Sequence, residues 1–188
     1  MKKHAVIILA AGVALAGATV AARQAPKAAP GAASIRAHAD IKGEGITGTA
    51  DLVETGQGTG KIVNLTVTVS GLKPGMHGVH LHAVGKCTPD FAAAGGHFDP
   101  GPAGNADPDA NHPFHMGDVP QLSAGADGKA TMKAATTRVT LSDGPVSLFD
   151  ADGSAIIIHG NPDQGITGES KSGVSGGPRV ACGVIEKK

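Results

Sequence analysis

Histidines spaced along the middle and end of the chain are the residues with the clearest chemical potential. His80 and His82 stand two positions apart in the segment Val79-His80-Leu81-His82. On a β-strand both rings would leave one face while Val79 and Leu81 point into a core. Two imidazoles on one face can bind one metal ion, although such pairs also occur on surfaces and in hydrogen-bonded networks.

Further potential ligands follow this pair along the chain. His97 lies in Gly-Gly-His-Phe-Asp-Pro, the run His112-x-x-His115-x-x-Asp118 comes next, and His159 ends an apolar stretch. With the first pair they make seven potential nitrogen and oxygen ligands and no thiolate, a set that suits copper and zinc. Histidines scattered independently through a core explain this grouping less well. The residues therefore favour a metal site.

Short β-strands are the elements that would position these ligands. The alternation is clearest in residues 63–69, where Val63, Leu65, Val67 and Val69 share one face. Weaker strand patterns cover residues 35–41, 46–54, 79–84, 129–139, 154–159 and 179–185. The 29 Gly and 12 Pro, with no Trp or Tyr, also indicate many short elements joined by turns. Seven or eight such strands predict an all-β sandwich or barrel.

Two long segments, residues 85–113 and 160–178, have no periodic pattern. Loops of this length without regular structure are usually functional. Because they contain or flank most of the histidines, we expect the site to lie under them, on the outside of the β scaffold.

The first 23 residues have the pattern of a secretory signal peptide. Lys2 and Lys3 precede a mostly apolar stretch that ends in small residues before Arg23. The alternative is an uncleaved membrane anchor, but the stretch is rich in Ala and Gly and weakly apolar for a span. Residues 24–34, rich in Ala and Pro, predict a flexible tether, and residues 35–188 a single domain. The predicted location is therefore periplasmic or secreted.

Charge and cysteine content fit this location. The chain has 16 Lys and Arg against 16 Asp and Glu, and loss of the leader would make it slightly acidic. Nothing in this balance indicates a nucleic-acid partner. Cys87 and Cys182 are the two cysteines, and in an oxidising compartment we expect one disulfide rather than two thiols.

Four motifs resemble those of the copper/zinc superoxide dismutase family. They are residues 75–82 (GMHGVHLH), 95–100 (GGHFDP), 115–118 (HMGD) and 177–185 (GPRVACGVI), and they occur in the family's order. The likeness extends from about Ile35 to Ile185. It implies a Greek-key β-sandwich or flattened barrel of about eight antiparallel strands with two long functional loops. It also implies a superoxide dismutase that converts superoxide to dioxygen and hydrogen peroxide by copper redox cycling, with zinc in a structural role.

The resemblance also implies the metal ligands. Four histidines match the family's copper ligands: His80, His82, His97 and His159. His97 would bridge the two ions and carry a proton. Zinc would take His97, His115, Asp118 and one more histidine. Here the chain departs from the common pattern, because Asn105 stands in the expected region; we assign the place to His112.

Other residues take roles by the same resemblance. Asp163 would hydrogen-bond one copper histidine and one zinc histidine together. Arg179 would lie beside the open copper position and attract the anion, with Lys171 as a weaker candidate. Cys182 would tie the strand of Arg179 to Cys87. His77 is predicted to make structural hydrogen bonds beneath the site, His4 falls in the leader, and His38 is predicted to lie on an early strand without partners.

Two rival functions remain open at this point: a superoxide-dismutase-like protein that binds or delivers copper, and a copper-only dismutase. The predicted partner is superoxide as substrate, with no nucleic acid and no membrane partner after signal cleavage. A homodimer is possible.

Overall fold

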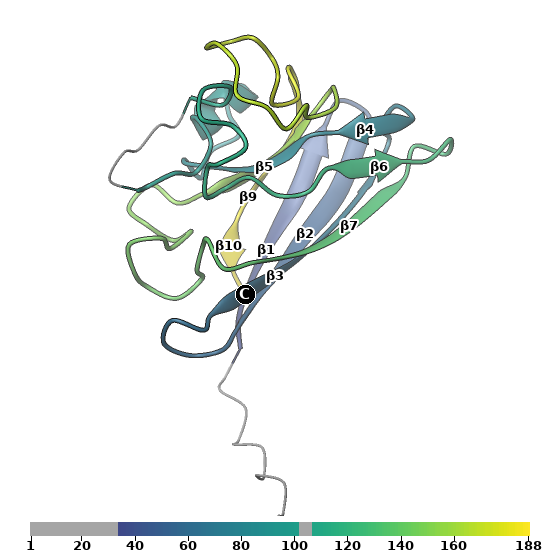
Figure 1. Cartoon of the computed structure of the whole chain (residues 1–188). Coiled ribbons are helices and arrows are strands. Elements are labelled where there is room, and N and C mark those ends of the chain that lie inside the picture. The colour runs from purple at the N-terminus through teal and green to yellow at the C-terminus, as the bar shows by residue number, and fades with distance from the viewer. Residues whose placement is uncertain (1–33, 102–106) are drawn as a thin grey trace, which may run out of the picture. The chain divides into compact units, whose positions relative to one another are not determined.

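Antiparallel strands make up almost all the regular structure in the described part of the chain (Figure 1). A computed structural model describes residues 34–101 and 107–188; the predicted signal segment, almost all of the predicted tether, and Asn105 lie outside these ranges. The strands and the single 3₁₀ turn are, in chain order, β1 (Ile35–Gly43), β2 (Ile46–Thr55), β3 (Ile62–Ser70), β4 (Gly75–His77), β5 (Val79–His82), η1 (Phe91–Ala94), β6 (Leu122–Ala124), β7 (Ala130–Thr136), β8 (Ala155–His159), β9 (Arg179–Val184) and β10 (Glu186–Lys187).

Eight strands form one curled sheet and two form a small second sheet. The large sheet has the order β5-β8-β9-β1-β2-β3-β7, with β10 paired to β1, and β4 pairs with β6. Every pairing is antiparallel. Figure 1 shows the long strands β1, β2, β3 and β7 side by side, and β5 at the upper end near the long loops. The predicted all-β class with antiparallel strands is confirmed.

Three strands, β4, β6 and the two-residue β10, were absent from the sequence prediction, and two predicted strands continue at least two residues past the observed C-terminal ends. The predicted strand 129–139 ends at Thr136, and the predicted strand 79–84 ends at His82. The missed strands β4 and β6 have three residues each. Three residues are too few for an alternation to be recognised, so the pairing of β4 with β6 is a tertiary feature.

The two faces of β5 explain how the site is placed. All four residues of β5 are buried: Val79 and Leu81 belong to the main core, while His80 and His82 are covered from the other side. In the neighbouring strand β8, Ile156 and Ile158 pack in the main core, Ala155 and Ile157 on the other face belong to a second, smaller apolar cluster, and His159 ends the strand. This end of the sheet therefore carries the main core on one face, and His80, His82 and His159 beside a small apolar cluster on the other.

The buried carboxylate of Glu54 holds the long connection after β7. Only 5% of Glu54 is exposed, and its Oε2 accepts hydrogen bonds from the backbone N–H groups of Leu141 (2.6 Å) and Ser142 (3.0 Å). Burial alone would raise the pKa of Glu54, but these hydrogen bonds and nearby Lys61 lower it overall. The ionised carboxylate therefore stabilises the fold.

We expect Glu54→Gln to lower the free energy of unfolding at pH 7 by about 1–3 kcal/mol. The lowered pKa means that this stabilisation is complete above the ordinary value of 4.5 and is lost as pH falls through the folded value. The difference between wild type and variant should thus shrink in acid. Urea unfolding at pH 7 and in acid measures it, with exposed Glu186→Gln as the control; a difference that is independent of pH would contradict the assignment.

His38 has partners that the sequence analysis did not give it. Its Nδ1 lies 2.9 Å from Asp51 Oδ1, and its Nε2 lies 3.3 Å from Asp40 Oδ1. Asp40 shares its face of β1, and Asp51 is its direct cross-strand neighbour on β2. The hydrogen bond to Asp51 is the main reason that the pKa of His38 is raised. The prediction of an isolated histidine was therefore wrong.

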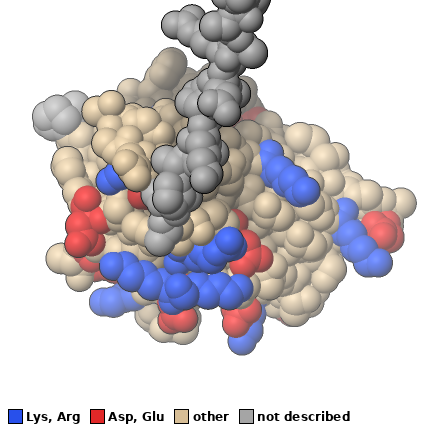
Figure 2. Space-filling view, turned by 90° about the horizontal axis from the view of Figure 1, so that it is seen from below, with Lys and Arg blue, Asp and Glu red and all other residues tan. Residues whose placement is uncertain are grey.

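The underside of the domain carries charges of both signs. Figure 2 shows Lys and Arg side chains gathered along one band of this face, with Asp and Glu among them. Lys188 pairs with Asp51 at 3.4 Å and Lys187 with Asp143 at 3.9 Å, all with exposed side chains. Such pairs contribute little to stability.

The helical content of the described residues is one short 3₁₀ turn, and no helix in those ranges is long and apolar enough to cross a membrane.

Candidate metal centre

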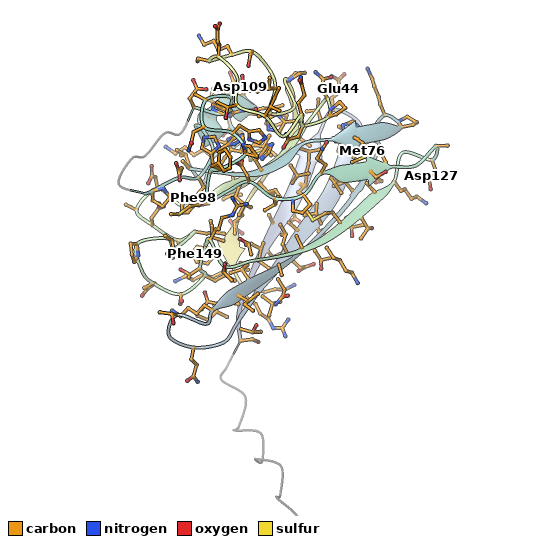
Figure 3. The ribbon with its side chains drawn as sticks, viewed as in Figure 1. Glu44, Met76, Phe98, Asp109, Asp127 and Phe149 are labelled. Carbon is orange, nitrogen blue, oxygen red and sulfur yellow. A yellow bond between two sulfur atoms is a disulfide. The ribbon has the colours of Figure 1, made fainter. Side chains whose placement is uncertain are left out.

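Backbone pairing brings loop residues onto the outer face of β5. His82 forms an isolated β-bridge with His97, and His80 forms one with Asp118. His159 lies at the end of β8, the strand next to β5. All six predicted histidine ligands are buried. Figure 3 shows the crowded side chains of this region between the labelled Asp109 and Phe98.

His82, His97 and His159 form one possible metal-binding group. One nitrogen of each ring lies within 4.8 Å of the others, and the Nε2 atoms are buried without a hydrogen-bond partner. The opposite nitrogens of two rings are engaged: His82 Nδ1 lies 3.1 Å from the Gly95 carbonyl oxygen, and His159 Nδ1 lies 3.0 Å from that of Gly177. Because a carbonyl oxygen can only accept, the proton of each ring lies on Nδ1. The lone pair on Nε2 is then available to a metal ion.

The carboxylate of Asp118 is the centre of a second group. The Nδ1 atoms of His97, His112 and His115 lie 2.8, 3.4 and 3.1 Å from its oxygens. A tetrahedral zinc ion with bonds of about 2.0–2.1 Å holds its ligand atoms about 3.3–3.4 Å apart. The donor set and its spacing therefore fit zinc, and His97 belongs to both groups through its two nitrogens.

His80 lies between the two groups. Its ring stacks on His97 at 4.1 Å and meets His159 edge-on at 5.1 Å between centroids. Its unpartnered Nδ1 is 3.2 Å from Asp118 Oδ1, so distance alone associates it with His97, His112 and Asp118. The resemblance had placed it with copper. The structure brings all seven predicted ligands together, and His80 can reach either group.

Burial lowers the pKa of some of these histidines, and nearby carboxylates raise the pKa of others. Burial lowers the pKa of His97 to about 4 and that of His159 to about 3, so these rings are neutral at neutral pH. Burial would also lower the pKa of His112, but Asp118 and Asp163 raise it to about 9. The pKa of Asp118 is lowered, because hydrogen bonds from the surrounding rings outweigh its burial.

Asp163 lies between the rings of His112 and His80. Its Oδ1 is 2.7 Å from His112 Nε2, and its Oδ2 is 3.5 Å from His80 Nε2. Gln121 holds the backbone of Asp163 on both sides: its Oε1 accepts from the Asp163 N–H at 2.9 Å and its Nε2 donates to the Asp163 carbonyl at 2.8 Å. The carboxylate is therefore fixed where it can orient both rings.

Arg179, the first residue of β9, borders the histidine group of β5 and β8. It donates to the carbonyl oxygens of Phe91 (2.7 Å) and Gly95 (2.6 Å), and the latter also accepts from His82. A pocket of about 490 Å³ is lined by Arg179, His159 and Lys171 among others. Arg179 also lines a cavity of about 560 Å³ that none of the six predicted ligand histidines lines. Of the four predicted copper ligands, only His159 lines the first pocket.

Sequence reasoning missed Arg138, which holds the chain at the second group. Its guanidinium donates to the carbonyl oxygens of His115 (2.9 Å) and Asp118. In the sequence it is one basic residue at the end of a predicted strand, and no local signal distinguishes it. His77 makes the structural contacts predicted for it: its ring nitrogens lie 2.8 Å from the carbonyl oxygens of His159 and Lys73.

The predicted disulfide between Cys87 and Cys182 is confirmed. Cys182 lies in β9, three residues after Arg179, and Cys87 lies in the loop whose residues Phe91 and Gly95 accept from that arginine. The bond therefore ties the arginine strand to the segment that fixes the guanidinium.

We expect the double variant Cys87→Ser/Cys182→Ser to unfold more easily by about 2–5 kcal/mol, because the disulfide closes a loop with a sequence separation of 95. Denaturant unfolding of oxidised wild type, reduced wild type and the variant measures this. Reduced wild type should match the variant. Equal stability of all three samples would show that the disulfide does not stabilise the domain.

Comparison with known proteins finds similar sequences and a similar solved structure. A sequence model of the family described as copper/zinc superoxide dismutase (SODC) matches residues 46–185. A protein of Brassica juncea named superoxide dismutase [Cu-Zn] 2 is 41% identical over 146 residues, which are 76% of this chain and 90% of the relative. A superoxide dismutase [Cu-Zn] of Caulobacter vibrioides is 43% identical over 130 residues, 66% of this chain and 71% of the relative. A crystal structure of the clock protein EA4 superposes with a TM-score of 0.63 at 27% identity, over 80% of this chain and 92% of that one.

Proposed function

The chain belongs to the copper/zinc superoxide dismutase family, and on that basis we propose which of its residues bind each metal ion. The protein is a superoxide dismutase that uses copper and zinc and converts superoxide to dioxygen and hydrogen peroxide. The assignment of each ion to particular residues is the proposal.

Copper is held by His80, His82, His97 and His159, and zinc by His97, His112, His115 and Asp118. The observation that carries this division is the shared ring of His97, whose Nε2 belongs to the group of His82 and His159 and whose Nδ1 lies 2.8 Å from Asp118. The unpartnered buried Nε2 atoms of His82, His97 and His159 support the copper group, and the unpartnered Nδ1 of His112 supports the zinc group. His80 goes to copper because it shares β5 with His82 and meets His159, while His115 completes the set around Asp118.

When bound, copper supplies one-electron redox chemistry and zinc a fixed positive charge. Two superoxide ions and two protons give one dioxygen and one hydrogen peroxide, so the site must deliver protons. His97 can hold and release one at Nε2, which faces the group of His82 and His159, while its Nδ1 stays beside Asp118. Solvent supplies the second through the pocket lined by Arg179.

Metal content and dismutation activity, measured before and after chelation, test this function. We expect one copper and one zinc for each chain. Activity should be lost when copper is removed and should return when copper is added back. Copper binding without dismutation would instead favour a copper-delivery protein. Full activity with copper alone and no zinc uptake would favour a copper-only enzyme.

We also propose that the protein is periplasmic or secreted after removal of residues 1–23. The charged, apolar and small-residue segments at the N-terminus support this, as does a disulfide, which is typical of exported proteins. Cell fractionation with N-terminal sequencing tests it, and a protein that retains Met1 in the cytoplasm would refute it.

A further inference from the structure

Asp109 is a buried carboxylate for which neither the sequence motifs nor the metal groups give a role. It is 4% exposed and lies in the loop that also carries His112 and His115. Its Oδ2 accepts from the Gly173 N–H at 2.8 Å, and its Oδ1 accepts from the N–H and Oγ of Ser175 at 3.0 and 2.8 Å. All these donors lie in the other long loop, between β8 and β9.

Ser175 connects this carboxylate to a histidine of the site. The carbonyl oxygen of Ser175 lies 3.0 Å from His80 Nε2, closer than Asp163 Oδ2 at 3.5 Å. An N–H donated from Nε2 to this carbonyl leaves the lone pair on Nδ1, the unpartnered nitrogen. The orientation and tautomer of His80 thus depend on where the backbone of Ser175 is held.

Within its own loop, the segment around Ser175 is held by backbone hydrogen bonds from Gln164 to the Val174 carbonyl (2.8 Å) and from Asn161 to the Gly176 carbonyl (3.0 Å), whereas Asp109 is its link to the other long loop. Gly173 and Gly176 have positive φ values of 80° and 109°, so the segment forms a turn without strand pairing. The segment also packs closely, because a Cβ on Gly176 would lie 2.7 Å from the Cβ of His159. A shift of this turn would therefore disturb His80 and His159 together.

We propose that Asp109 is a positioning residue for the copper ligand His80, acting through Ser175 and joining the two long loops. The inference rests on the proposed function, because it takes His80 as a ligand of copper. Residues that orient metal ligands typically change metal affinity by about 10- to 100-fold when replaced. Since Asp109 acts through one intermediate residue, we expect an effect near the lower end.

The test compares Asp109→Asn with wild type in the full chain. Asparagine keeps the size of the side chain but has one acceptor oxygen, so it cannot accept from Gly173 and Ser175 as the carboxylate does. Cu(II) affinity of the zinc-loaded protein is measured by chelator competition, and the Cu(II) environment by electron paramagnetic resonance. Amide exchange of residues 173–175 is measured in the metal-free protein. Asp127→Asn is the matched control, because Asp127 accepts a backbone N–H from Lys129 in an exposed turn outside both loops.

We expect Asp109→Asn to bind Cu(II) about 10-fold more weakly, with a changed resonance spectrum and faster exchange at residues 173–175, and Asp127→Asn to match wild type. Ser175→Ala removes only the Oγ contact and should change the spectrum in the same direction by less; it decides the question if Asp109→Asn does not fold. Unchanged affinity and spectrum, or loss of zinc with normal copper, would overturn the proposal. Wild type that binds copper without dismutation would refute the proposed function alone.

Discussion

Arg179→Ala is expected to lower the second-order rate constant for superoxide by about 10- to 100-fold at low ionic strength, with both metals still bound. Local fields of this kind alter association rates by roughly 10- to 1000-fold. The arginine is the cross-strand neighbour of His159, and its guanidinium donates to the backbone carbonyl oxygens of Phe91 and Gly95. Its loss should therefore act on capture of the anion and leave the metal sites intact.

The fixed position of the guanidinium sharpens this test. Because Arg179 is held by the carbonyl oxygens of Phe91 and Gly95, Arg179→Lys restores the charge without the two-pronged attachment. We expect lysine to recover part of the rate. Rates from pulse-generated superoxide are compared at several salt concentrations, since screening extends over about 10 Å at 0.1 M salt.

Arg36→Ala serves as the control, because Arg36 is an exposed arginine of β1 outside the pocket. It should keep the rate and salt dependence of wild type. If Arg179→Ala shows a wild-type rate and salt slope, the arginine has no part in capture. If it loses copper, the role of Arg179 is structural.

Sequence patterns predicted the parts of the fold and site that depend on short spacing. The alternation in β3 and the i, i+2 pair His80 and His82 each specify a face within one strand, and both elements formed as expected. The long strands β1, β2, β8 and β9 were also predicted, with small errors at their ends.

Contacts between distant loops could not be predicted in this way. Arg138 reaches two carbonyl oxygens 20 or more positions away, and Asp109 accepts from residues more than 60 positions away. Such contacts follow from the way in which the loops fold over β5, and neither residue belongs to a local motif. His38 differs, because its contact with Asp40 two positions on is local and was overlooked.

His112→Ala is expected to weaken zinc binding by at least about 100-fold while copper remains, because loss of a ligand should exceed the 10- to 100-fold typical of supporting residues. The ring is buried, its Nδ1 lies 3.4 Å from Asp118 Oδ2, and Asp163 holds its Nε2. No other histidine of the described residues is free to replace it: His38 lies on β1 with its own carboxylates, and His77 is bound to two carbonyl oxygens.

The alanine variant distinguishes the role of the His112 imidazole from the role of the loop that carries it. Thr167 Oγ1 donates to the backbone carbonyl of His112 at 2.6 Å, and this bond survives the substitution. A loss of zinc would then report the missing imidazole and leave the loop connection in place. Zinc affinity is measured by competition with a chelator, with copper content determined on the same samples and His38→Ala as the matched control. Zinc affinity equal to that of wild type would remove His112 from the ligand set, whereas loss of both metals would mean that its ring supports the whole centre through Asp163.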